Sequence, residues 1–114
     1  FGEDTYLTKV MGVSFVRGTE GTDVSNDKRV ASSLKHYVGY GFPFSGRDRT
    51  DALIPENVLR EHHLPQFKAA VDAGARTVMV NSASINGTPG HINKYLLTDV
   101  LKNEFKFDGF IVSD

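Results

Sequence analysis

Three short apolar segments alternate along this chain with stretches of helical periodicity, and this alternation limits the folds that the chain can adopt. The strand-like segments are residues 30–36, 77–81 and 110–113, of which the second is the clearest. Continuous apolar character in the second and third segments is typical of parallel strands that are buried on both faces. The order therefore predicts an α/β fold with parallel crossovers, which leaves a barrel and a doubly wound sheet both open.

The first helical segment begins directly after Asp4, whose side chain can accept a hydrogen bond from a free backbone N–H group of the first turn. We expect this helix to end near residues 18–21, because two glycines lie there. One face of the predicted helix contains Leu7, Val10, Met11 and Ser14.

Two further helices are predicted from their end signals. Pro65 divides residues 56–73 into two pieces or begins the second piece, and Gly74 fits a left-handed position past the end. Asn93 can cap the third helix, which continues to Phe105. The expected apolar faces contain Leu64, Phe67, Ala70 and Val71 in the second segment and Leu97, Val100, Leu101 and Phe105 in the third.

The loop between the first strand and the second helix is long and covers residues 39–55. Loops above about 12–15 residues in compact domains are usually functional or disordered. The aromatic side chains Tyr40, Phe42 and Phe44 argue against disorder here. A second loop, residues 84–91, contains an Asn-Gly and a Pro-Gly dipeptide, and both are turn signals.

The composition excludes several classes of function. A formal net charge of -1 gives no reason to expect binding to nucleic acid or to an acidic membrane surface. No apolar run approaches the roughly 20 residues that span a bilayer. The absence of cysteine excludes a disulfide scaffold, a thiol nucleophile and a thiolate metal site. No metal or other cofactor is predicted, and neither nucleic acid nor a membrane is an expected partner.

Polar residues follow each of the three predicted strands: Lys35 and His36, Asn81 and Ser82, and Ser113 and Asp114. In parallel α/β folds the carboxyl ends of the strands open toward one shared mouth, where ligands bind. Strand ends are also polar simply because they reach solvent, but three in succession favour a site. The sequence therefore predicts a small polar pocket that donates hydrogen bonds to several hydroxyls, with Asp114 as its catalytic carboxylate.

A series of short segments resembles glycoside hydrolase family 3, the β-glucosidase type. These segments are residues 2–7 (GEDTYL), 34–41 (LKHYVGYG), 46–49 (GRDR), 59–67 (LREHHLPQF), 73–80 (AGARTVMV), 85–89 (INGTP), 96–98 (LLT) and 107–114 (FDGFIVSD). The likeness covers essentially the whole chain, in order, so the set is specific although each segment is short. The resemblance implies a partial (β/α)8 TIM-like barrel, with roughly three βα units ending at a strand tip.

The resemblance also implies roles for individual residues. Asp114 would be the catalytic nucleophile, and Lys35 and His36 would donate hydrogen bonds to hydroxyls of the sugar next to the bond that is cut. Met79 and Ser82 would line that pocket and bind the substrate. The family commonly has a tyrosine three residues after this methionine, where this chain has Ser82, so the pocket wall and the support of the nucleophile differ there.

The implied activity is that of an exo-acting retaining glycoside hydrolase that releases terminal β-D-glucosyl or related residues from oligosaccharides or glycosides. Residues 1–114 would be the middle part of a single (β/α) barrel catalytic domain, truncated at both ends. The expected partners are a carbohydrate substrate and the remainder of the parent chain, including a C-terminal domain with the acid/base residue. The segment alone is therefore expected to be inactive, and the resemblance implies a periplasmic or secreted enzyme.

Other interpretations stay open on the residues alone. Lys35 at a strand tip could form a Schiff base, as in aldolase-like barrels, with Asp114 as the proton acceptor. A non-catalytic sugar-binding barrel, or phosphorolysis in place of hydrolysis, would use the same pocket. Arg47 and Arg49 could contact sugar, pair with Asp48 and Asp51, or be solvated cations of the loop.

Two further motifs carry little weight. His62 and His63 are adjacent on a predicted helix, where neighbouring side chains diverge by about 100° and cannot chelate one metal together. Asn86-Gly87-Thr88 matches the pattern of an N-glycosylation acceptor, which matters only in a secretory pathway that glycosylates proteins.

Overall fold

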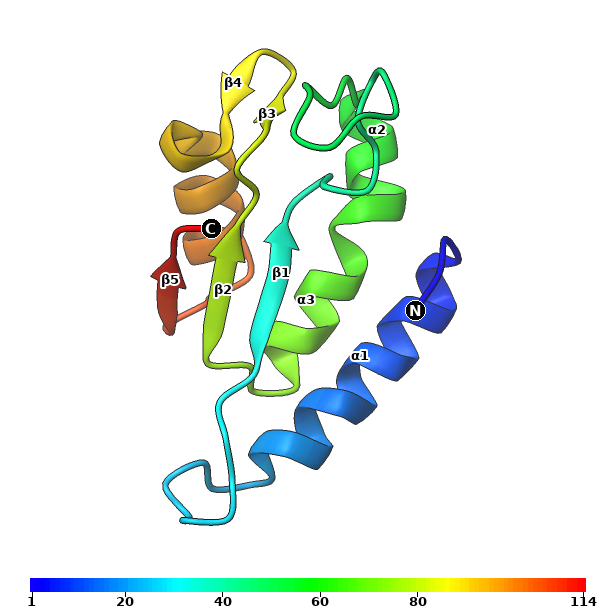
Figure 1. Cartoon of the computed structure of the whole chain (residues 1–114). Helices are drawn as coiled ribbons and strands as arrows, with labels where there is room; N and C mark the ends of the chain where they lie inside the picture. The colour runs from blue at the N-terminus through cyan, green and yellow to red at the C-terminus, as the bar shows by residue number, and fades with distance from the viewer.

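Three parallel strands form the central sheet of the computed structural model, which describes all of residues 1–114 (Figure 1). They are β1 (Ser33–Tyr37), β2 (Thr77–Val80) and β5 (Phe110–Val112), with β2 in the middle and both pairings parallel. Helical segments connect each strand to the next, which confirms the predicted α/β fold with parallel crossovers. The first strand begins three residues later than predicted and continues through Tyr37.

Helices precede the sheet and fill both crossovers. The helix before β1 is α1 (Thr5–Glu20). The first crossover contains α2 (Glu56–Val58), the π-helical segment η1 (Leu59–His63) and α3 (Pro65–Asp72), so Pro65 divides this segment as predicted. The second crossover contains the short 3-10 turn η2 (Gly90–Ile92) and η3 (Tyr95–Glu104), a helix with π-type hydrogen bonding.

Hydrogen bonds confirm the predicted helix ends. The backbone N–H of Leu7 donates to Asp4 Oδ1 at 2.6 Å, and the backbone N–H of Leu96 donates to Asn93 Oδ1 at 3.0 Å. Each carboxylate or amide oxygen thus satisfies a donor that has no partner within its helix. Gly74 follows α3 with a φ of +105°, a conformation that residues with a Cβ rarely adopt.

One face of the sheet, here called the covered face, packs against the helices. Leu34, Val78 and Ile111 lie side by side in register on this face, and all three contact the main apolar core. The helices contribute Leu59, Leu64, Leu96, Val100, Leu101 and Phe105 to that core. The predicted inward faces of the second and third helical segments are therefore largely confirmed.

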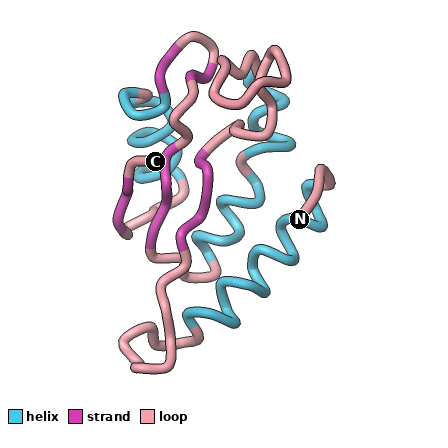
Figure 2. The backbone as a smooth tube through the Cα atoms, in the orientation of Figure 1, coloured by secondary structure: helices cyan, strands magenta, loops and turns pink.

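The opposite face, here called the open face, has no helix in front of it (Figure 2). Side chains alternate along a strand, so the residues between those of the covered face point to this side. They include Ser33 and Lys35 of β1, which are exposed, and Thr77 and Met79 of β2, which are half-buried. Phe110 of β5 is 63% exposed there.

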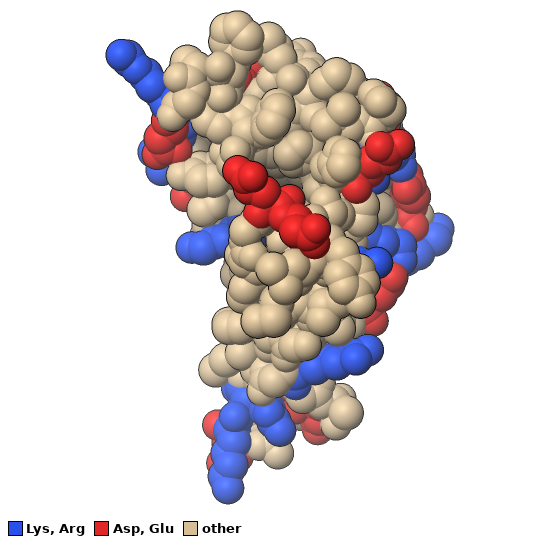
Figure 3. Space-filling view, turned by 90° about the vertical axis from the view of Figure 1, so that its right-hand side faces the viewer, with Lys and Arg blue, Asp and Glu red and all other residues tan.

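Helix α1 has the predicted bounds but packs through other residues than its predicted apolar face. Val16, which is 1% exposed, clusters with Ala70 of α3 and with Ala75. Leu7 and Met11 are 48% and 43% exposed, and the surface on this side of the molecule is uncharged over much of the area below a central group of acidic side chains (Figure 3). Helical periodicity shows that a helix has an apolar side, but it does not show which element lies against that side.

A two-stranded hairpin takes the place of the simple loop predicted for residues 84–91. Strands β3 (Ser84–Ile85) and β4 (Thr88–Pro89) pair antiparallel. The turn between them consists of Asn86 and Gly87, whose φ angles are +50° and +79°. Two-residue hairpin turns of type I′ need positive φ at both central residues, which is why Asn-Gly is favoured there.

Candidate active site

A bulge in β1 brings three of the predicted site residues together on the open face. Between two regular pairs of β1 and β2, Lys35 and His36 lie opposite the single residue Met79. Bulges redirect side chains and are common beside active sites. Met79 also pairs with Val112 of β5, which is two residues before Asp114.

The side chains of Lys35 and His36 make no hydrogen bond or ion pair within the chain. Lys35 is exposed, and His36 is half-buried against the ring of Tyr40, with 4.4 Å between the ring centroids. Both side chains therefore have donors available for a ligand, and the aromatic contact restricts the orientation of the imidazole.

A cavity of about 680 Å³ opens beside the bulge. Its lining includes Lys35 and His36 together with Tyr40, Phe42 and His63. Only 5 of its 15 lining residues are hydrophobic, and part of the lining comes from α1 and α3, so the cavity lies between β1 and these helices. Burial lowers the pKa of His63, so the neutral form of this imidazole is favoured in the cavity wall. Asp114 does not line this cavity, so the structure places the carboxylate in a separate part of the site.

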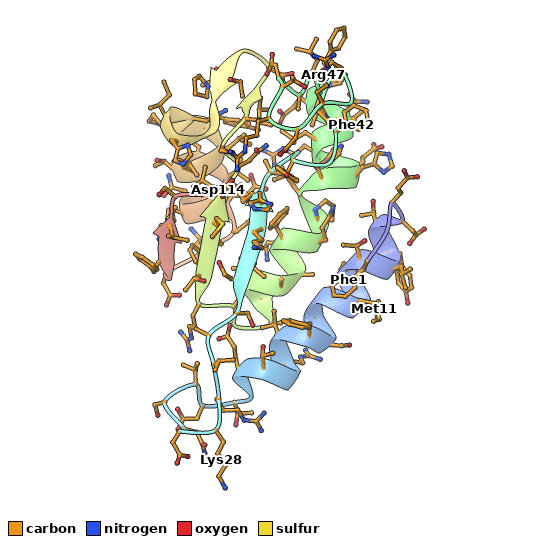
Figure 4. All side chains as sticks on the ribbon, in the orientation of Figure 1. Phe1, Met11, Lys28, Phe42, Arg47 and Asp114 are labelled. Carbon is orange, nitrogen blue, oxygen red and sulfur yellow. The ribbon has the colours of Figure 1, made fainter.

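Asp114 lies past the end of β5, and one of its carboxylate oxygens accepts two contacts (Figure 4). Ser82 Oγ donates a hydrogen bond to Asp114 Oδ2 at 3.0 Å. The Arg49 guanidinium lies 3.7 Å from the same oxygen. The Asp114 side chain is only 20% exposed, so these contacts restrict a partly buried carboxylate.

Tyr40 lies between the two groups of site residues. The pKa of the Tyr40 phenol is raised above its ordinary value, chiefly by the Asp48 carboxylate beside it. The charge of Asp114 raises this pKa as well, and the charge of Arg49 lowers it. Tyr40 therefore lies against the ring of His36 and near the charges of Asp114 and Arg49.

The sequence did not predict the contact between Arg49 and Asp114. The predicted partners of the loop arginines were aspartates of the same loop or sugar, whereas the structure pairs Arg49 with a residue at the end of another strand. No local pattern signals a pairing between a loop and a strand tip so far apart in the chain. Asn81, which was grouped with Ser82 as a strand-tip residue, is fully buried and donates through Nδ2 to Val38 O at 2.9 Å, so its role is structural.

Two glutamates of the helices, Glu56 and Glu104, occupy a surface cluster away from this site. Arg60 contacts Glu56 at 2.8 Å and Glu104 at 2.6 Å, and the hydroxyl of Tyr95 also hydrogen-bonds Glu56. This cluster connects α2 and η1 to η3, and both glutamates are largely exposed. It gives Glu56 and Glu104 a structural role.

The structure has neither a candidate metal site nor a helix that could span a membrane. It contains no group of three or more histidine, cysteine, aspartate or glutamate side chains arranged to hold a metal ion. No helix has the length and apolar character needed to cross a bilayer.

Asn86, the candidate glycosylation acceptor, is engaged through both ends of its side-chain amide. Its Oδ1 accepts from Ile54 N at 2.8 Å, and its Nδ2 donates to Ile54 O at 2.8 Å. The nitrogen that would carry a glycan therefore already has a partner. These two bonds fasten the hairpin to the end of the long loop.

Comparison with known proteins identifies the family. The whole chain, residues 1–114, matches the glycosyl hydrolase family 3 N terminal domain. It is 45% identical over 120 residues to the lysosomal beta glucosidase of Dictyostelium discoideum and 40% identical over 114 residues to the periplasmic beta-glucosidase of Salmonella typhimurium. Both alignments cover 100% of the chain and 15% of the relative, so the chain spans about one-seventh of these proteins' length.

Solved structures agree with this assignment. A beta-glucosidase from Listeria innocua in complex with gluconolactone superposes on 99% of the chain and 16% of its own length, with a TM-score of 0.95 and 34% identity. An exo-1,3/1,4-beta-glucanase from a Pseudoalteromonas species covers 98% of the chain and 14% of its own length, with a TM-score of 0.88 and 40% identity. The predicted partial barrel and the suspected relationship are both confirmed, and the chain belongs to glycosyl hydrolase family 3.

Proposed function

We propose that this chain carries the nucleophile side of the active site of an exo-acting retaining glycoside hydrolase of the β-glucosidase type. The observation that carries the proposal is the partly buried Asp114 carboxylate, held by Ser82 at the tip of β5. The bulge with Lys35 and His36 lies on the same face of the sheet. The family relationship supports the reaction class, because the similar proteins named above are beta-glucosidases and a beta-glucanase.

In the proposed reaction an oxygen of the ionised Asp114 side chain forms a bond to the anomeric carbon of the terminal sugar. The bond from that carbon to the leaving oxygen breaks at the same time, and the leaving oxygen takes a proton from a general acid. Water then attacks the anomeric carbon and gives its proton to the same group acting as a base, which releases the sugar and regenerates the carboxylate. Two inversions at one carbon retain its configuration.

Lys35, His36 and Met79 form the proposed sugar subsite. The Lys35 ammonium has three donors and no partner in the chain, which suits it to bind neighbouring hydroxyls. The His36 imidazole can donate to a further hydroxyl in its neutral form. Met79 lies opposite both residues and supplies an apolar contact surface for the sugar ring.

The general acid is proposed to lie in the remainder of a longer protein, together with a domain that follows the barrel. The helix glutamates Glu56 and Glu104 are engaged in the surface cluster with Arg60. The segment of 114 residues is therefore expected to be inactive alone. It would form the middle part of the barrel in the complete enzyme.

The proposal is tested on the full-length protein that contains this segment. NMR spectroscopy of the first product of aryl β-glucoside hydrolysis is expected to show the β-anomer, as retention requires. A 2-deoxy-2-fluoro-β-glucosyl fluoride is expected to inactivate the enzyme, and peptide mass spectrometry is expected to locate the label on Asp114. The same protein with Asp114→Asn serves as the control and should take up no label.

Different results would contradict this assignment. An α-anomer as the first product would show inversion, and a label on another carboxylate would remove Asp114 from its role. Trapping of a carbonyl substrate on Lys35 by borohydride would favour the Schiff-base interpretation instead. If the full-length protein bound β-glucosides but did not hydrolyse them, the result would indicate a non-catalytic sugar-binding barrel.

A further inference from the structure

The two contacts of the Asp114 carboxylate converge on one oxygen. Ser82 Oγ donates to Oδ2 at 3.0 Å, and Arg49 Nη2 lies 3.7 Å from that oxygen. The other side-chain oxygen has no hydrogen bond or ion pair within the chain. One hydrogen bond and one ion-pair contact on the same oxygen restrict rotation of the carboxylate group and leave the second oxygen without a partner in the chain.

Arg49 reaches this position from a loop that is held by its own hydrogen bonds. Thr50 Oγ1 donates to Arg47 O at 2.8 Å, and Phe44 N donates to Asp51 O at 2.8 Å, so the two sides of the loop are closed around Arg49. Arg49 itself has a φ of +63°. Residues with a Cβ adopt this conformation only at a cost, and it persists where the surrounding structure enforces it.

The loop is also fastened to the hairpin of β3 and β4, and Ser82 lies in the short segment that joins β2 to this hairpin. The backbone N–H of Gly87 contacts the Asp51 carboxylate at 3.1 Å, and Ala52 bridges to Ile85. The two groups that contact Asp114 therefore come from segments that are connected to each other. Their positions relative to the carboxylate are set by backbone contacts as well as by the side chains.

We propose that Arg49 is a positioning residue for Asp114. Together with Ser82 it holds Oδ2, so that the other oxygen faces the anomeric carbon and forms the new bond as the glycosidic bond breaks. The leaving oxygen takes its proton from the general acid described above, so no further reactant is needed. This inference rests on the proposed function.

The experiment compares the full-length wild-type protein with Arg49→Met, Ser82→Ala, the double variant and Arg49→Lys. The probe is 2-deoxy-2-fluoro-β-glucosyl fluoride, and the rate constant of inactivation is measured separately from the affinity for the probe. Each single substitution is expected to lower the rate constant by about tenfold or more and to change the affinity by less than about threefold, because orientation and not binding is lost.

Since both residues act on one oxygen, the double variant is expected to lose clearly less than the product of the two single effects. Arg49→Lys, which keeps a cation at this position, is expected to recover part of the rate. The matched control is Arg47→Gln, which changes an exposed arginine of the same loop that lies at its outer end and makes no ion pair (Figure 4). The factor by which Ser82→Ala lowers the rate constant of inactivation is expected to be the same in the Arg47→Gln background as in the wild type.

The failure of this inference can be told apart from the failure of the proposed function. If the wild-type protein takes up no label on Asp114, the proposed function is wrong. If the wild type is labelled on Asp114 and Arg49→Met is labelled at the same rate, only the positioning role is wrong. Strictly multiplicative effects in the double variant, or a loss of affinity without a loss of rate, would overturn the positioning role as well.

Discussion

The two faces of the sheet differ in role: the covered face packs into the core, and the open face carries residues of the candidate site. On the covered face, Val78 is 0% exposed and packs with Leu34 and Ile111 into a core that reaches Leu101 of η3. On the open face, the same three strands present Lys35, Met79 and the polar residues beyond their tips. Alternation along a strand thus places a stabilising residue next to a residue that is free for chemistry.

At the bulge in β1, a core residue and a site residue lie close together in the sequence. Tyr37 is 2% exposed, and its hydroxyl donates to Leu96 O at 3.0 Å within the core, whereas Lys35 two residues earlier has no partner in the chain. Substitutions on the covered face are therefore expected to change stability, and those on the open face are expected to change catalysis. Measuring stability and activity for the same variants tests this separation of roles.

The largest effect is expected from Leu101→Ala in the core. The side chain is 0% exposed, and its truncation leaves a cavity that should lower the free energy of unfolding by about 2–5 kcal/mol. Chemical denaturation of the full-length protein measures this change. The kcat/KM of the folded variant should stay within about twofold of the wild-type value, since no site residue moves. A large loss of kcat/KM without a loss of stability would contradict the separation of the faces.

Lys35→Met should lower kcat/KM for an aryl β-glucoside by about 10- to 100-fold. The substitution keeps the length of the side chain but removes charged donors to the sugar hydroxyls, which are among the stronger hydrogen bonds in proteins. The free energy of unfolding should hardly change, because Lys35 has no partner in the chain. The matched control is Lys28→Met at the opposite end of the molecule (Figure 4), which should leave both quantities unchanged.

Asn86→Ala tests the connection between the long loop and the hairpin. It removes two hydrogen bonds to the backbone of Ile54 and should lower the free energy of unfolding by about 1–3 kcal/mol. Denaturation and limited proteolysis within residues 39–55 measure the effect. Thr88→Ala, which changes the other end of the glycosylation pattern at an exposed position, should change stability by less than about 0.5 kcal/mol. Equal effects of the two substitutions would contradict a fastening role for Asn86.

Tyr37→Phe is expected to have the smallest effect, about 1 kcal/mol at pH 7 from the lost hydrogen bond to Leu96. Burial raises the pKa of Tyr37 in the folded state above the value of about 10 that holds in an unfolded chain. The contribution of the neutral phenol is therefore fully present below pH 10 and decreases as the pH rises above it. The difference in unfolding free energy between wild type and variant should shrink above pH 10. A difference that stays constant with pH would contradict the buried position of this hydroxyl.

Local signals allowed much of the fold to be predicted. Asp4, Pro65 and Asn93 act within one turn of their own helices, so their effects follow from neighbouring residues. The apolar side of α1 could be recognised but not its surroundings, because periodicity contains no information about which element packs on it. The pairing of β3 with β4 was missed although Asn-Gly is a hairpin signal, because each strand has only two residues.

The residues of the candidate site could be predicted from local sequence, but the contacts between them could not. Lys35, His36 and Asp114 were predicted because each follows an apolar run at a position where parallel strands share a mouth. The bulge that places Lys35 and His36 opposite Met79 depends on the register of two strands, which no single segment determines. The contact of Arg49 with Asp114 depends on the path of a long loop and needed the structure.

A crystal structure of the full-length protein trapped with 2-deoxy-2-fluoro-β-glucosyl fluoride tests the account most directly. We expect a bond from the anomeric carbon to the side-chain oxygen of Asp114. Lys35 and His36 should donate to the sugar hydroxyls at about 2.7–3.2 Å, and Met79 should contact the ring. A sugar attached to another residue, or one that lies beyond the reach of both Lys35 and His36, would contradict the assignment of chemistry to the open face.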